Sequence, residues 1–150
     1  MARHEDFIRR CIELSYQSRE KRNGPFGALL VIRDRIVLEA ENTVISGGNP
    51  LGHSELNLLI MAVQRFSRDE MGQATLYTSA ESCVMCAGAI FNSGLRHVVY
   101  AASAEALRKY FPEDPYISSR DIFATCGVKI QVEGPILEEE ALKAHEGFWS

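Results

Sequence analysis

The chain has 150 residues, of which 46% are hydrophobic and 24% charged, and its formal net charge is −4. This balance is ordinary for one globular domain over residues 1–150 and excludes a low-complexity or repeat architecture. The longest apolar run, residues 26–32, is too short to cross a bilayer, and the acidic balance argues against a partner held mainly by phosphate contacts. We therefore expect a cytoplasmic protein that does not associate with membranes and keeps its cysteines as thiols.

Helical and extended patterns alternate along the chain. Apolar residues recur on one face of the first helix, and the two strands after it are close enough for a hairpin. The expected helices cover residues 4–22, 53–66, 82–92, 104–109 and 137–145. The expected strands cover residues 26–32, 36–40, 74–78, 96–101 and 128–132. The alternation predicts a layered α/β domain, and the hairpin predicts a mixed sheet. The side chains expected to face inward from the second helix are Leu56, Leu59, Ile60 and Val63.

Two short motifs carry the chemistry, and each lies at the start of an expected helix. Residues 53–55 read His-Ser-Glu, and residues 83–86 read Cys-Val-Met-Cys. One imidazole and two thiolates can hold zinc and leave a fourth position open, as in catalytic rather than structural sites. A helix N-terminus also favours thiolate over thiol. Glu55 follows His53 closely enough to serve a water in the open position.

The alternative for Cys83 and Cys86 is half of a closed zinc knuckle, which needs a fourth protein ligand. The remaining candidates for that ligand are Cys126, His97, His145 and His4. None of these residues has matching spacing, and His53 alone can equally be a histidine at a helix end. The two motifs together, in this order, favour a catalytic Zn2+ over a structural one.

A histidine-x-glutamate motif followed by Pro-Cys-x-x-Cys is the signature of zinc-dependent nucleobase deaminases. Here Ser82 replaces the proline, and we expect it to cap the helix that follows. The chain resembles the cytidine deaminase-like superfamily, in the branch of guanine, cytosine and tRNA-adenosine deaminases, over about residues 23–101. The segments that carry the resemblance are residues 24–28, 49–55 and 76–90. The resemblance implies a three-layer α/β/α sandwich with a mixed five-stranded sheet.

The resemblance also implies roles for individual residues. His53, Cys83 and Cys86 would be the zinc ligands. Glu55 would be the general acid/base that moves protons from water to the substrate ring and to the leaving ammonia. Asn42 matches a substrate-binding asparagine, although a loop asparagine that forms a turn explains it equally well from the residues alone. Phe26 is interpreted either as a wall of the pocket or as strand core.

Guanine, converted to xanthine and ammonia, is the first expected substrate. In guanine deaminases an acidic residue binds the purine and the C-terminal segment closes the site, which makes Asp114, Phe148 and Trp149 the candidates here. Each has a plainer interpretation, because Asp114 can be a solvated loop acid and Trp149 can anchor the last helix.

Adenosine in tRNA is the alternative substrate, although the C-terminal tail of this chain is acidic where that subfamily is usually basic. Cytosine or another small aminated ring is the third candidate substrate. A zinc-binding module without activity is the remaining class, and the presence of Glu55 argues against it. The resemblance further implies a homodimer. Residues 89–91 of the short helix are interpreted either as apolar contact surface or as core.

Overall fold

The computed structural model describes residues 3–114 and 116–150, and it is built on one five-stranded sheet. The strands are β1 (Gly27–Ile32), β2 (Arg35–Glu41), β3 (Thr75–Ala80), β4 (His97–Ala102) and β5 (Gln131–Glu133). Their spatial order is β2-β1-β3-β4-β5. β1 pairs antiparallel with β2 and β3, whereas β3, β4 and β5 run parallel. The predicted mixed sheet is therefore confirmed.

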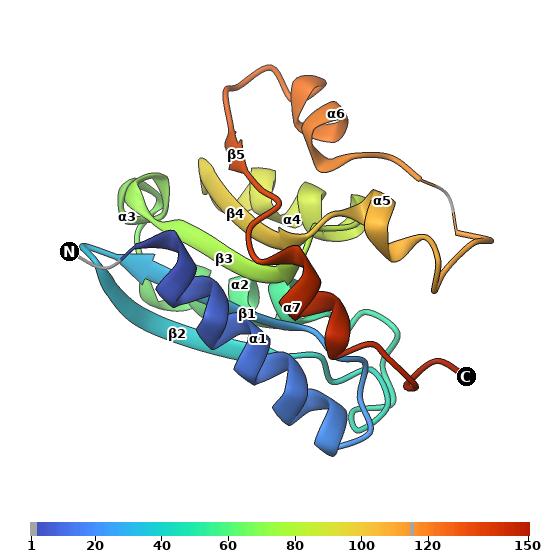
Figure 1. The fold of residues 1–150 in the computed structure, drawn as a ribbon. Coiled ribbons are helices and arrows are strands. Elements are labelled where there is room, and N and C mark those ends of the chain that lie inside the picture. Colours follow the sequence, from blue (N-terminus) through green and yellow to red (C-terminus); the bar gives the residue numbers. More distant parts are fainter. Residues whose placement is uncertain (1–2, 115) are drawn as a thin grey trace.

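Helices cover both faces of this sheet (Figure 1). They are α1 (His4–Glu20), α2 (Ser54–Arg65), α3 (Arg68–Gln73), α4 (Val84–Ser93), α5 (Ala104–Leu107), α6 (Ser119–Ala124) and α7 (Glu138–Lys143). Buried side chains of α1 and α7 form a cluster on one face, and those of α2, α3, α4 and α6 form a second cluster on the other. The three-layer α/β/α sandwich expected from the sequence is confirmed.

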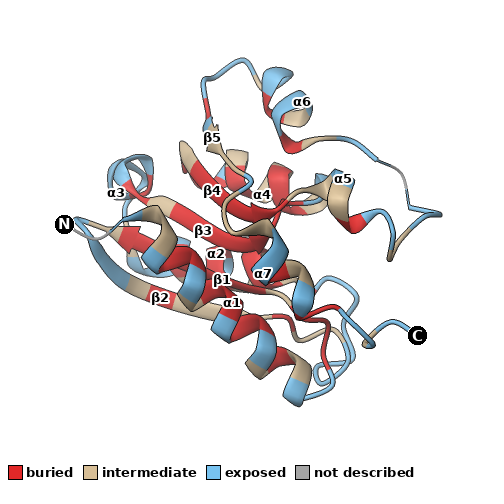
Figure 2. Ribbon diagram, in the orientation of Figure 1, coloured by how far each residue is buried: buried red, intermediate tan, exposed pale blue. Residues whose placement is uncertain are grey.

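The central strands supply alternate side chains to the two clusters because successive residues of a strand point to opposite faces. Leu29 and Val99 pack against α1, while Leu30 and Val98 pack toward α2 and α4. Burial is accordingly concentrated on the sheet and on the inner faces of the helices (Figure 2). This rigid centre carries the ends of the elements from which the functional site is built.

The structure corrects the expectation for the second helix and adds two short helices. Ile60 and Val63 are 52% and 50% exposed rather than inward, because α2 is oriented by its buried residues Leu58, Leu59 and Ala62. The short helices α3 and α6 were not expected from the sequence. Each begins with a serine that accepts a hydrogen bond from the backbone three residues later, which is a common helix-start signal.

Two further expectations concern the whole chain. None of the four cysteines takes part in a disulfide bond. Over residues 3–114 and 116–150, none of the helices is both long enough and apolar enough to cross a membrane.

A close contact between α1 and β1 depends on Gly27. A Cβ atom at this position would lie 2.5 Å from Leu14 Cβ and 2.7 Å from the backbone oxygen of Cys11. We predict that Gly27→Ala lowers the free energy of unfolding by about 1–3 kcal/mol, since α1 has to shift away from β1. Denaturant unfolding followed by circular dichroism measures the change.

Gly88 provides the matched control because it lies within α4 and a Cβ there would meet no atom within 4 Å. Gly88→Ala should be neutral or stabilising by up to about 1 kcal/mol, because alanine loses less backbone entropy in a helix. Equal unfolding midpoints for Gly27→Ala and the unmodified protein would contradict the steric argument.

Candidate metal centre and the adjoining pocket

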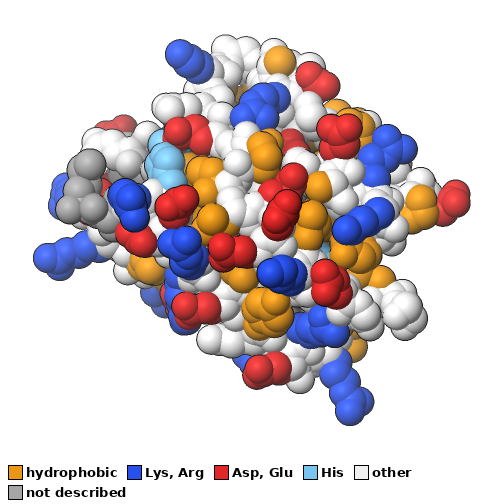
Figure 3. Space-filling model, in the orientation of Figure 1, with side chains coloured by type: hydrophobic (Ala, Val, Ile, Leu, Met, Phe, Trp, Pro, Cys, Tyr) orange, Lys and Arg blue, Asp and Glu red, His pale blue; other side chains and the backbone are white. Residues whose placement is uncertain are grey.

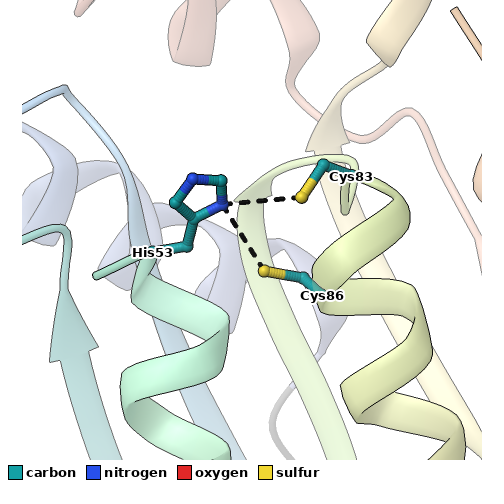
Figure 4. A group of neighbouring side chains, drawn as sticks. All are labelled: His53, Cys83 and Cys86. Carbon is teal, nitrogen blue, oxygen red and sulfur yellow. Dashed lines mark hydrogen bonds between the residues drawn. The ribbon is translucent and has the colours of Figure 1, made fainter. Parts of the chain in front are cut away.

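The two predicted metal-binding motifs meet at the N-termini of α2 and α4. His53 is the residue that precedes α2, Cys83 precedes α4, and Cys86 lies in the first turn of α4. Figure 4 shows the His53 ring directed at both sulfur atoms. His53 Nδ1 lies 3.5 Å from Cys83 Sγ and 3.6 Å from Cys86 Sγ. The structure thus brings the three predicted ligands together.

These distances fit a tetrahedral zinc ion. With Zn–N and Zn–S bonds of about 2.05 and 2.3 Å, a nitrogen and a sulfur on one tetrahedron are about 3.6 Å apart. The three side chains form a group whose ligand atoms lie mutually within 4.8 Å. The donor set, one imidazole and two thiolates, suits zinc, and it occupies only three of the four tetrahedral positions.

Without a metal ion, the surroundings favour negative charge on one of the two sulfurs, that of Cys83. Hydrogen bonding to Cys86 and to His53 lowers the pKa of Cys83 to about 4. The pKa of Cys86 is raised because its thiol is hydrogen-bonded to Cys83 and because the side chain is buried. The contact with Cys83 raises the pKa of His53. A dication between these three groups would favour the deprotonated form of every one of them.

Glu55 is held firmly beside this centre. It lies in the first turn of α2 and is 6% exposed. Ser54 Oγ donates to one carboxylate oxygen at 2.7 Å, and Ser82 Oγ donates to the other at 3.0 Å. Burial raises the pKa of Glu55, and the Ser54 hydrogen bond opposes that change. Because both donors are fixed in the fold, the carboxylate has one defined position.

The expected role of Ser82 as a helix cap is wrong. The N-cap of α4 is Cys83, and no side chain caps that helix. The Ser82 hydroxyl donates instead to Glu55, since a buried carboxylate needs donors to replace the water it has lost. Ser82 therefore belongs to the support of the acidic residue, a role that a proline at this position could not fill.

A cavity of about 730 Å³ lies over the metal centre. Every site residue predicted from the sequence lines it except Cys86, which is fully buried behind the centre. The predicted residues that line the cavity are Phe26, Asn42, His53, Glu55, Cys83, Asp114, Phe148 and Trp149. The structure consequently joins residues from six separate stretches of the chain in one pocket.

The structure shows the local turn at Asn42 and also places this residue at the cavity. Its Oδ1 accepts a hydrogen bond from the backbone of Val44 at 2.9 Å, which closes a local turn. The residue is buried and also lines the cavity. Within the described parts of the chain its NH₂ group has no hydrogen-bond acceptor, so this group can donate to a molecule in the pocket.

The C-terminal aromatic residues form part of the pocket wall and also anchor the end of the chain. The Trp149 ring lies with its centroid 4.6 Å from that of Phe111 and 6.3 Å from that of Phe26. Its indole nitrogen donates to His145 Nδ1 at 3.0 Å. The buried His145 stays neutral at ordinary pH because desolvation lowers its pKa to about 4, which leaves its Nδ1 free to accept.

Glu81 is a buried acid that supports the pocket wall and that no sequence motif singles out. Its carboxylate is buried and accepts hydrogen bonds from the backbone of Ala104 at 2.9 Å and of Ser119 at 2.7 Å. The Ser119 hydroxyl donates to it as well. Glu81 thereby ties the starts of α5 and α6 together, and the loop that carries Asp114 lies between these helices. No local sequence pattern signals these long-range contacts.

The fold and the site together define a class of zinc hydrolases. In this class the fold is an α/β/α sandwich, and the metal centre lies at helix N-termini. Residues 1–102 match the family described as the cytidine and deoxycytidylate deaminase zinc-binding region. The chain belongs to this family of zinc-dependent hydrolytic deaminases.

Individual relatives within the match differ in substrate. The chain is 36% identical over 149 residues to a probable cytosine deaminase of Schizosaccharomyces pombe, covering 95% of this chain and 90% of that protein. It is 29% identical over 140 residues to a tRNA-specific adenosine deaminase of Buchnera aphidicola, and the match covers 93% of this chain and 89% of that protein. A solved guanine deaminase from Nitrosomonas europaea shares the fold with a TM-score of 0.84 and 24% identity, covering 99% of this chain and 86% of that one.

The geometry of the centre predicts the effect of removing one sulfur. Cys86→Ser should abolish zinc binding at this centre, because serine does not supply a thiolate to complete the three-ligand set. Metal analysis, together with the sulfur-to-metal absorption of the cobalt-substituted protein, measures the loss. Cys126→Ser is the matched control, since Cys126 is a free, half-buried thiol of the segment after α6. Undiminished sulfur-to-cobalt absorption in Cys86→Ser would contradict the assignment.

Proposed function

We propose that this deaminase acts on a free purine base, with guanine as the substrate and xanthine and ammonia as the products. The observation that carries the proposal is the composition of the pocket. Asp114 and the aromatic residues Phe148 and Trp149 line the same cavity as Glu55 and the metal centre. An acid and aromatic rings opposite a hydrolytic centre suit a flat, hydrogen-bonding heterocycle.

In this proposal His53, Cys83 and Cys86 hold the zinc ion, and Glu55 moves the protons. When bound, zinc supplies a water of lowered pKa for hydrolysis. Glu55 accepts a proton from the attacking water and delivers it to a ring nitrogen of the substrate. It then assists the transfer of a proton to the departing ammonia. Its two serine donors keep the carboxylate in place during both transfers.

The pocket walls account for binding. Phe26 and Trp149 offer apolar ring surface, and Asn42 offers an amide donor to an acceptor on the base. Asp114 accepts from a ring N–H of the purine. The imidazole ring of a free purine carries an N–H where a nucleoside carries ribose, so a carboxylate directed at that position favours the free base.

Adenosine in tRNA is the alternative, supported by the relative from Buchnera aphidicola. Arg22 and Arg108 line the cavity and could face phosphates. On the face seen in Figure 3, however, basic and acidic side chains are interspersed rather than gathered into a basic patch, and a basic patch is the usual mark of RNA binding. Cytosine remains the third candidate, supported by the relative from Schizosaccharomyces pombe.

The assembly and location of the protein are proposals of the same kind. We expect a homodimer and a cytoplasmic location, and we treat residues 1–150 as one domain. The outer faces of α2 and α4 carry exposed apolar side chains that suit a contact between subunits, namely Ile60, Val63 and Val84. Ile90 is fully buried within its own chain, so it belongs to the core and not to such a contact.

Removal of the Glu55 carboxylate tests the mechanism. Glu55→Ala should lower kcat by about 10²–10⁴-fold, since general acid–base catalysis is lost, while zinc content and the circular dichroism spectrum stay unchanged. Glu13→Ala, on the exposed side of α1, is the control and should keep full activity. Normal turnover by Glu55→Ala would refute the proposed role.

An ammonia-release screen over guanine, adenine, cytosine, their nucleosides and tRNA tests the substrate. Guanine should give the highest kcat/KM. Asp114→Asn should raise KM for guanine by about 10-fold, because one charge-assisted hydrogen bond is weakened. Glu113→Gln is the control, as this neighbouring acid is exposed and does not line the cavity. Release of ammonia from tRNA or cytosine but not from guanine would overturn the choice of ring and leave the deaminase assignment intact.

A further inference from the structure

A second group of metal-ligating side chains lies at the opposite end of the sheet from the pocket. His4 is the first residue of α1, His97 is the first of β4, and Glu133 is the last of β5. One ligand atom from each lies within 4.8 Å of the others. The pocket lies beyond the carboxyl end of β3, whereas this group lies beside Thr75 at its start. The five steps along β3 from Thr75 to Ala80 separate the two by about 16 Å at 3.3 Å per residue.

The sheet register explains why the three side chains meet. β4 and β5 run parallel, with Val99 opposite Glu133. His97 lies two residues before Val99 and therefore shares its face, which is the face packed against α1. The start of α1 then places His4 over the same point. Strand pairing and helix packing, rather than a local motif, produce the cluster.

The contacts bring the three ligand atoms together. One oxygen of Glu133 faces Nε2 of His4 at 3.1 Å and also contacts Nε2 of His97. The other ring nitrogen of each histidine is held from behind by a hydroxyl group. His4 Nδ1 is 2.7 Å from the Tyr77 hydroxyl, and His97 Nδ1 is 3.1 Å from that of Thr75. Metal-bound histidines are held in this manner, with the outer nitrogen hydrogen-bonded to a fixed group.

We propose that His4, His97 and Glu133 bind a second divalent transition-metal ion, in the first instance zinc, independently of the centre at His53. Two imidazoles and one carboxylate are an established zinc donor set. Ligand atoms on a zinc tetrahedron are about 3.3 Å apart, and the His4–Glu133 distance of 3.1 Å is close to this value. The His97–Glu133 distance of 2.5 Å is shorter, and these two side chains have to move apart by about 0.8 Å around an ion.

Charge and access both suit an ion. The Glu133 carboxylate lies against Nε2 of both histidines, so it offers its negative charge where a cation would sit. The side chains of His4, His97 and Glu133 are 37%, 26% and 36% exposed. An ion can therefore enter from solvent without unfolding, and the open coordination position would hold water. Binding would tie the short edge strand β5 to α1 and stabilise the folded state.

Cobalt titration of the metal-depleted full chain distinguishes the two centres, because thiolate ligands give intense charge-transfer absorption and a nitrogen–oxygen set gives only weak ligand-field bands. We expect the unmodified protein to bind two equivalents. Glu133→Gln should bind one equivalent with undiminished thiolate absorption. Glu39→Gln is the matched control, a partly exposed strand glutamate paired with Arg10, and it should keep both equivalents.

Tyr77→Phe gives a second test that leaves all three ligands in place. Loss of the hydroxyl behind His4 should weaken the affinity for the second metal equivalent by about 10–100-fold, while the affinity for the first equivalent is unchanged. Circular dichroism confirms that each variant is folded. The proposal is overturned if the unmodified protein binds only the thiolate equivalent. It is equally overturned if Glu133→Gln binds the second equivalent as tightly as Glu39→Gln does, which would mean an adventitious ion only.

Discussion

The requirement that most constrains this fold is that two helices must begin at the same point in space. His53 reaches the sulfurs of Cys83 and Cys86 at 3.5 and 3.6 Å only because α2 and α4 lie side by side on one face of the sheet. The sheet in turn is fixed by α1 on its other face, where Gly27 allows close contact. A small shift of either helix would break a tetrahedral arrangement that tolerates errors of only a few tenths of an ångström.

Buried acids are the second element on which the site depends. Glu55 and Glu81 both lie within the fold, and each is fully supplied with donors. The two differ in the kind of donor. Glu81 is held by two backbone amides in addition to the Ser119 hydroxyl, and these contacts fix the starts of α5 and α6 on either side of the loop that carries Asp114. Glu55 is held by hydroxyls and faces the cavity, where it remains accessible for proton transfer.

Periodic and spaced features could be predicted from the sequence, whereas features that arise from contact between distant segments could not. All the apolar residues that define the inner face of α1 are buried as expected, because a long amphipathic helix leaves a strong pattern. The three metal-binding side chains were found from two short motifs. The bond from Ser82 to Glu55, by contrast, joins residues that are far apart in sequence, and the clustering of His4 with His97 depends on sheet register.

The pocket is lined partly by residues inside the family match and partly by residues beyond its end. The match ends at residue 102, so it includes His53, Glu55 and the cysteines but not Asp114 or Trp149, which complete the walls. In the proposed function, the hydrolytic centre and two of the proposed substrate contacts, Phe26 and Asn42, therefore lie inside the matched stretch, whereas the remaining wall lies beyond it. If that wall selects the ring, as proposed, substitutions there would change which amine is accepted while the hydrolytic centre stays intact. The later stretch would then be the part of the chain in which a new substrate preference could evolve.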